Sequence, residues 1–113
     1  MAVISINDAN FYSMIADKER CIVKFYADWC GTCRLLTADF NALSAVKENA
    51  GISFMEVNAE FNPLSIAFAG VHDLPFFIIT QNGVVVKGEK LNRIDEVDRL
   101  LSTIKKKIAP SIK

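Results

Sequence analysis

Cysteine and histidine are scarce in this chain, which has three cysteines and one histidine among its 113 residues. Three cysteines are too few for a small secreted scaffold that several disulfides hold together. A structural zinc site normally takes four Cys or His ligands. It would have to recruit Cys21, at the start of an apolar run, and His72, far along the chain. We therefore expect no metal site.

The sequence also lacks an excess of charge and any long apolar run. Lys and Arg number 13 and Asp and Glu number 13, so the net charge of +0 shows no electrostatic signature of a nucleic-acid or membrane partner. No apolar run approaches the roughly 20 residues that cross a membrane. Residues 1–8 do not have the basic and apolar segments of a secretory signal. We expect a cytoplasmic protein that binds neither nucleic acid nor membranes.

The overall composition, 51% hydrophobic and 23% charged residues, fits one globular domain over residues 1–113. Continuous apolar runs predict buried strands, and apolar residues spaced by three or four predict helices. Predicted strands cover residues 3–6, 21–26, 52–58, 76–80 and 84–87, and predicted helices follow Asn7 and Cys33, cover 64–69 and begin near Ile94. This order predicts an α/β fold, a central mixed β-sheet flanked by helices on both faces.

Local signals predict where the helices begin, end and face the core. Asn7 is expected to cap the first helix, and residues 49–51 are expected to end the second. The apolar stripe of the second helix includes Leu35, and that of the last helix extends to Ile108.

Two cysteines separated by two residues form the most informative motif, Trp29-Cys30-Gly31-Thr32-Cys33, which follows a predicted strand and precedes a predicted helix. A CxxC turn at a helix start brings both sulfurs within disulfide reach. Unpaired N–H groups and the positive end of the helix dipole favour the thiolate of the first cysteine, and the thiolate is the form that attacks disulfides. The motif predicts a redox site, although CxxC is also half of many zinc sites. Trp29 and Gly31 suit an exposed turn better than a buried, inert pair.

Taken together, the motifs resemble the thioredoxin family over nearly the whole chain. The resemblance rests on FYADWCGTC at 25–33, residues 58–63 ahead of a short helix, Leu74-Pro75 after Gly70-Val71, and an Asn82-Gly83 hairpin. It implies a thioredoxin fold and a thiol–disulfide oxidoreductase that reduces or exchanges protein disulfides without a cofactor. It also implies a separate reductase as electron donor, and we expect a monomer.

The resemblance assigns roles within the CxxC segment. It implies that Cys30 is the attacking nucleophile and Cys33 the resolving thiol, with Trp29, Gly31 and Thr32 beside the substrate. Thr32 stands where the family usually has proline, so the turn gains a backbone donor. An extra N–H near the thiolate should stabilise the reduced form and make this protein a weaker reductant than the typical member.

A second segment at the site is Leu74-Pro75. The resemblance implies that Pro75 is a cis-proline packed against the disulfide and that the backbone of Leu74 is free to pair with a substrate strand. Asp73 is unusual for the family here, and it should repel acidic partners and raise the pKa of Cys30. His72 is expected to be either a solvated surface residue or a group that tunes this loop.

Lys24 and Glu56 show a reversal of charge. Lys24 occupies the position where the family usually buries an aspartate beneath the resolving cysteine, and Glu56 occupies the position of its usual lysine partner. The two are expected to form a swapped ion pair in which Glu56 relays the proton of Cys33 and Lys24 favours the thiolate. The alternative is a compensated structural pair with no catalytic part.

Two other functions compete with that of a protein disulfide reductase. One is a binding or assembly module that keeps the fold while its redox activity is incidental. The other is a more oxidising disulfide isomerase or oxidase, which the reduction potential would distinguish.

Overall fold

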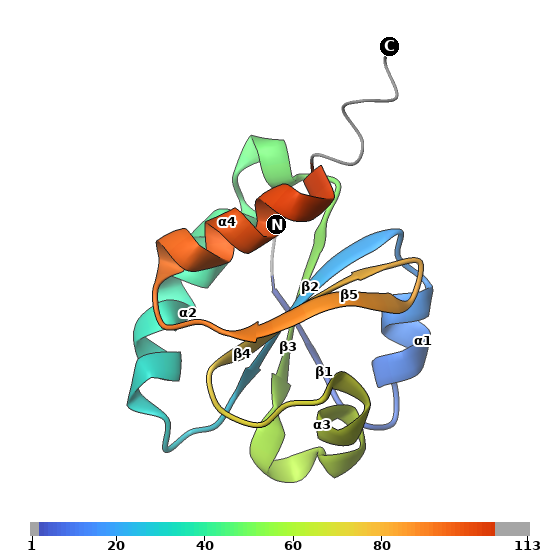
Figure 1. Cartoon of the computed structure of the whole chain (residues 1–113), viewed down its shortest axis with the longest axis vertical. Helices are drawn as coiled ribbons and strands as arrows, with labels where there is room; N and C mark the ends of the chain where they lie inside the picture. Colours follow the sequence, from blue (N-terminus) through green and yellow to red (C-terminus); the bar gives the residue numbers. More distant parts are fainter. Residues whose placement is uncertain (1–2, 106–113) are drawn as a thin grey trace.

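The computed structural model describes residues 3–105, which form a five-stranded mixed sheet with helices on both faces (Figure 1). The strand order is β1-β3-β2-β4-β5, with β1, β3 and β2 parallel and β4 and β5 antiparallel to their neighbours. The strands are β1 (Ile4–Ile6), β2 (Arg20–Tyr26), β3 (Ser53–Asn58), β4 (Phe76–Gln81) and β5 (Val84–Lys90). The predicted fold class and strand positions are thus confirmed.

Four α-helices and two 3₁₀ helices cover the sheet. They are α1 (Phe11–Ala16), α2 (Gly31–Ser44), η1 (Lys47–Asn49), η2 (Ala59–Phe61), α3 (Pro63–Ala69) and α4 (Ile94–Lys105). One core cluster joins α2 and α4 to the sheet face that carries Ile22 and Phe77, and the other joins α1 and α3 to the face that carries Val23 and Phe25. Side chains alternate along β2, so Lys24 shares the α2 face with Ile22.

The first helix begins later than its expected cap at Asn7. Asn7 instead closes a turn, because its Oδ1 accepts hydrogen bonds from the backbone N–H groups of Ala9 (2.9 Å) and Asn10 (3.2 Å). This local bonding competes with the helix, which starts at Phe11.

The second helix also differs from its prediction at one end and on one face. It ends at Ser44 rather than at residues 49–51, because Val46 is extended and buried Asn49 donates from Nδ2 to the carbonyl of Leu43 (2.9 Å). Leu35 is 79% exposed and does not belong to the core stripe. Buried side chains line α4 as predicted, but Ile108 lies outside the described residues.

Two connections position the site. The β2–α2 connection carries the CxxC segment, and the α3–β4 connection carries Leu74-Pro75, where the peptide bond is cis as predicted. The latter loop starts at Gly70, which ends α3 in the left-handed conformation (φ 70°) that glycine adopts without strain. Within residues 3–105, no helix has the length and apolar content needed to cross a membrane.

Candidate active site

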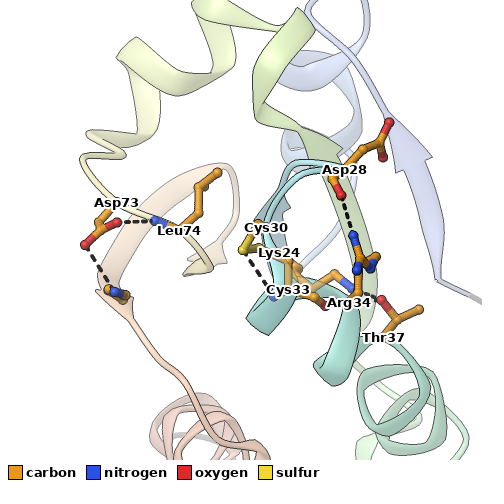
Figure 2. The surroundings of a disulfide bond; sticks show 9 residues. Lys24, Asp28, Cys30, Cys33, Arg34, Thr37, Asp73 and Leu74 are labelled. Atoms are coloured by element: carbon orange, nitrogen blue, oxygen red, sulfur yellow. Dashed lines mark hydrogen bonds and ion pairs between the residues drawn. A yellow bond between two sulfur atoms is a disulfide. The ribbon is translucent and has the colours of Figure 1, made fainter.

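Cys30 and Cys33 form a disulfide at the start of α2, with their Cα atoms 5.3 Å apart (Figure 2). The turn after β2 is closed by a hydrogen bond from the Cys30 N–H to the Ala27 carbonyl (3.1 Å). Cys30 is the N-cap of α2, and its Sγ accepts from the Cys33 N–H (3.1 Å). That N–H and the helix dipole would favour a thiolate at Cys30 once the disulfide is reduced.

The three cysteines differ in their access to solvent. Cys30 is 8% exposed, Cys33 is 1% exposed and Cys21 is fully buried, so Cys30 is the most accessible. Burial raises the pKa of the Cys21 thiol, which keeps it protonated. Trp29 stands beside the pair with 69% of its surface exposed, in position to contact a substrate.

We expect iodoacetamide to modify Cys30 of the reduced protein well before Cys33, and Cys21 last. Alkylation requires an accessible thiolate, and only Cys30 combines exposure with the helix N-terminus. Peptide mapping by mass spectrometry after short exposures at neutral pH would measure the order. A Cys21→Ala control should give the same rate for Cys30, and earlier labelling of Cys33 or Cys21 would contradict the assignment.

The Leu74-Pro75 segment reaches the disulfide through Leu74. Leu74 packs on the small buried cluster formed by Ala27, Cys30 and Cys33. Its N–H is not free, however, because it donates to Oδ1 of Asp73 (2.9 Å), and this part of the expectation for Leu74 is wrong. The cause is local, since the carboxylate next to it in sequence reaches the donor first.

Asp73 is itself paired. Its Oδ2 lies 3.1 Å from Nζ of Lys90, at the end of β5. The hydrogen bond from Leu74, followed by that from Lys90, lowers the pKa of Asp73. Lys90 therefore offsets the negative charge that was expected to act on Cys30. His72 is exposed, and its ring packs edge-on against Phe76 (5.2 Å between centroids).

The swapped charges of Lys24 and Glu56 meet. The parallel register of β2 and β3 places the two residues side by side, and Lys24 Nζ lies 3.8 Å from Glu56 Oε1. Lys24 is 1% exposed, and its ammonium also donates to Thr37 Oγ1 (3.4 Å). Glu56 accepts from Ser5 Oγ at its other oxygen (3.0 Å). Burial lowers the pKa of Lys24, and the neighbouring carboxylate opposes that shift in part.

This pair and Cys33 line one pocket of about 190 Å³. Thr37, which the sequence analysis did not single out, belongs to the same pocket, and its hydroxyl donates to the Cys33 carbonyl (3.2 Å). Its position four residues after Cys33, on the same face of α2, was the signal that could have found it. Arg34 closes one side by donating to the Asp28 carbonyl (2.8 Å; Figure 2). The pocket beside the resolving thiol thus holds a buried cation, Lys24, and a partly exposed carboxylate, Glu56.

A redox-active cysteine pair at a helix start, faced by a cis-proline loop, defines a thiol–disulfide oxidoreductase. Within residues 3–105, no three His, Cys, Asp or Glu side chains are grouped so as to hold a metal ion. The thioredoxin family model matches residues 2–106, so the chain belongs to the thioredoxin family.

Relatives agree with this assignment. The chain is 31% identical over 86 residues to thioredoxin from Haemophilus influenzae, covering 74% of this chain and 78% of that protein. It is 33% identical over 85 residues to thioredoxin from Streptomyces clavuligerus, covering 74% and 77%. A segment of 48 residues is 42% identical to protein disulfide-isomerase A4 from Bos taurus, which spans 42% of this chain but 8% of that protein.

Solved structures confirm the thioredoxin fold. Thioredoxin from Malassezia sympodialis superposes with a TM-score of 0.83 at 16% identity, covering 92% of this chain and 91% of that chain. Thioredoxin from Plasmodium falciparum gives 0.82 at 24% identity, covering 89% and 98%. The thioredoxin f2 in a complex with ferredoxin:thioredoxin reductase gives 0.83 at 17%, covering 92% and 96%. The chain is therefore a thiol–disulfide oxidoreductase, and a pure binding module is not favoured.

Proposed function

We propose that this chain reduces protein disulfides, with Cys30 as the attacking thiolate and Cys33 as the resolving thiol. The observation that carries the proposal is their placement: Cys30 caps α2 and is 8% exposed, whereas Cys33 lies inside the first turn and is 1% exposed. A substrate sulfur can reach the first thiol and not the second. The second thiol needs to reach only Cys30, which it already adjoins.

The exchange balances without a cofactor. The Cys30 thiolate attacks one sulfur of the substrate disulfide, an S–S bond forms between them, and the other substrate sulfur leaves as a thiolate. Cys33 then loses its proton and attacks Cys30 Sγ, which forms the Cys30–Cys33 disulfide and releases the first substrate sulfur. Two electrons pass from the dithiol to the substrate.

The proton of Cys33 needs an acceptor at the second step. Glu56 lines the same pocket as Cys33, and we assign it this role, with Lys24 favouring the Cys33 thiolate by attraction. Trp29, Gly31, Thr32, Leu74 and Pro75 form the surface offered to the substrate.

A separate reductase would return electrons to the Cys30–Cys33 disulfide. The similarity to a thioredoxin that was solved with a reductase supports this part of the proposal. We further propose that the protein acts as a monomer and that it acts in the cytoplasm; its small number of cysteines favours the second point. Gel filtration and cell fractionation would test these two points.

Isomerase or oxidase activity is the second candidate, favoured by Thr32 and by the segment similar to protein disulfide-isomerase A4. The reduction potential of the Cys30–Cys33 couple separates the two. The reduction potential of thioredoxin is about −270 mV and that of protein disulfide isomerase is about −180 mV. We expect a value nearer the first but less negative than it, and a value at or above the second would favour the isomerase.

Reduction of insulin by dithiothreitol tests the proposed activity directly. The protein should accelerate the appearance of insulin turbidity, and the Cys30→Ser variant should match dithiothreitol alone, because no thiolate remains at the exposed position. Equal rates for the protein and the variant would contradict the proposal.

A further inference from the structure

The backbone N–H of Leu74 is a hydrogen-bond donor beside the reactive disulfide that the sheet does not use. The ladders of β4 begin at Phe76, which pairs with Phe25 and Lys90. Pro75 contributes only its carbonyl, which accepts from the Leu91 N–H (3.2 Å). A donor at this point could receive a carbonyl of an extended polypeptide laid along the loop, as when a strand is added to a sheet edge.

Asp73 already occupies this donor. Its Oδ1 accepts from the Leu74 N–H (2.9 Å), and its Oδ2 pairs with Nζ of Lys90 (3.1 Å). Figure 2 shows the Asp73–Leu74 hydrogen bond, with Leu74 drawn between Asp73 and Cys30. The carboxylate is therefore held at both oxygens, by its own loop and by β5.

We propose that Asp73 is a specificity-determining residue, whose carboxylate caps the Leu74 N–H and must be displaced before a substrate strand can pair there, while Lys90 holds the cap in place. The proposal rests on the reduction of protein disulfides proposed above. It names the class of substrate affected: disulfides carried on an extended polypeptide, which present a carbonyl to Leu74. A small disulfide that has no main chain reaches Cys30 without moving Asp73.

The exchange of partners is unfavourable for a polypeptide. A hydrogen bond to a carboxylate is stronger than one to a neutral carbonyl, so the substrate forms a weaker bond than the one that it breaks. The Asp73–Lys90 pair is also strained or lost when the carboxylate moves. The cap thus lowers the rate of attack on polypeptide disulfides relative to small ones.

Single-turnover kinetics of the reduced protein would test this selectivity. The two probes are a flexible, uncharged peptide disulfide and bis(2-hydroxyethyl) disulfide, and both are neutral so that a change of charge at residue 73 does not favour either. The readout is the ratio of their second-order rate constants, which cancels any change in the thiolate fraction of Cys30. Asp73→Ala should raise the ratio about three- to tenfold, as expected for the net effect of one hydrogen bond.

Three further variants locate the cause. Asp73→Asn keeps an acceptor but loses Lys90, and Lys90→Met removes the tether alone, so each should give a smaller rise than Asp73→Ala. Lys87→Met is the matched control, because it breaks another ion pair of β5, with Glu89 (2.9 Å), that does not include Asp73. An unchanged ratio in Asp73→Ala, or an equal rise in Lys87→Met, would overturn the proposal.

Hydrogen exchange of the Leu74 amide, followed by NMR, reports on the cap without any substrate. Exchange should be faster in Asp73→Ala than in the parent protein, and equal exchange would overturn the proposal even if the rate ratio changed. If the parent protein attacks neither disulfide, the proposed function fails, while the amide measurement still decides whether Asp73 caps Leu74.

Discussion

Replacing Glu56 with alanine is expected to destabilise the fold by about 3 kcal/mol, because a buried cation would lose its anionic partner. Lys24 is 1% exposed and has Glu56 Oε1 3.8 Å from its ammonium. The cost lies at the low end of the range for broken buried pairs, since a quarter of the Glu56 side chain still reaches solvent. Urea denaturation of the oxidised protein would measure it. Ser5→Ala is the matched control, since it removes only the Ser5–Glu56 hydrogen bond and should cost about 1 kcal/mol.

The same pair predicts a rescue. Lys24→Ala should also be strongly destabilising, because it empties space in the core and leaves Glu56 without its cation. Lys24→Asp combined with Glu56→Lys should recover much of the loss, since it restores opposite charges at adjacent positions of β2 and β3. Additive effects in that double variant would show that the two side chains do not interact energetically.

Replacing Cys33 with serine is expected to stop turnover and to trap the protein on its substrate. Cys30 can still attack, but a hydroxyl at residue 33 does not supply the thiolate that resolves a mixed disulfide. Non-reducing gels and mass spectrometry should show a covalent adduct that only added thiol removes. Cys21→Ala is the matched control and should turn over like the parent, because Cys21 is fully buried. A turnover rate close to that of the parent in Cys33→Ser would contradict the assigned roles.

Glu56→Gln tests whether Glu56 accepts the proton of Cys33 when the mixed disulfide is resolved. If Glu56 accepts the proton of Cys33, the amide should slow resolution of the mixed disulfide while leaving the first attack by Cys30 unchanged. Rapid quenching of single-turnover reactions would separate the two steps, at a temperature where the variant remains folded. Unchanged resolution would leave Lys24 and Glu56 a structural pair only.

Features that depend on residue type along the chain could be predicted from the sequence. Continuous apolar runs identified the strands. Two helix starts were predicted to within a few residues, because α2 begins at Gly31, ahead of the predicted start after Cys33, and α3 begins at Pro63, one residue before the predicted 64–69. The cis peptide before Pro75 and the contact between Lys24 and Glu56 followed from matching a family whose backbone fixes both. The strands and helix starts depend on local sequence, and the Lys24–Glu56 contact depends on the parallel register of β2 and β3.

Features that depend on competition between nearby hydrogen bonds could not be predicted. Asn7 was a reasonable cap in isolation, but its side chain closes a turn instead. The donor at Leu74 was expected to be free, but the adjacent Asp73 takes it, and Lys90 pairs with the same carboxylate from β5. Leu35 matched an apolar spacing but is exposed to solvent. Spacing alone does not show which apolar positions of a helix the sheet covers.

The third cysteine determines how the protein should respond to an electrode or a redox buffer. Cys21 packs among the residues of the α1 and α3 face of the sheet, whereas Cys30 and Cys33 belong to a separate cluster at the end of β2. No third thiol can therefore exchange with the pair while the sheet is intact. Oxidation should follow a single two-electron Nernst curve. The ratio of disulfide to dithiol then changes tenfold for each change of about 30 mV in potential.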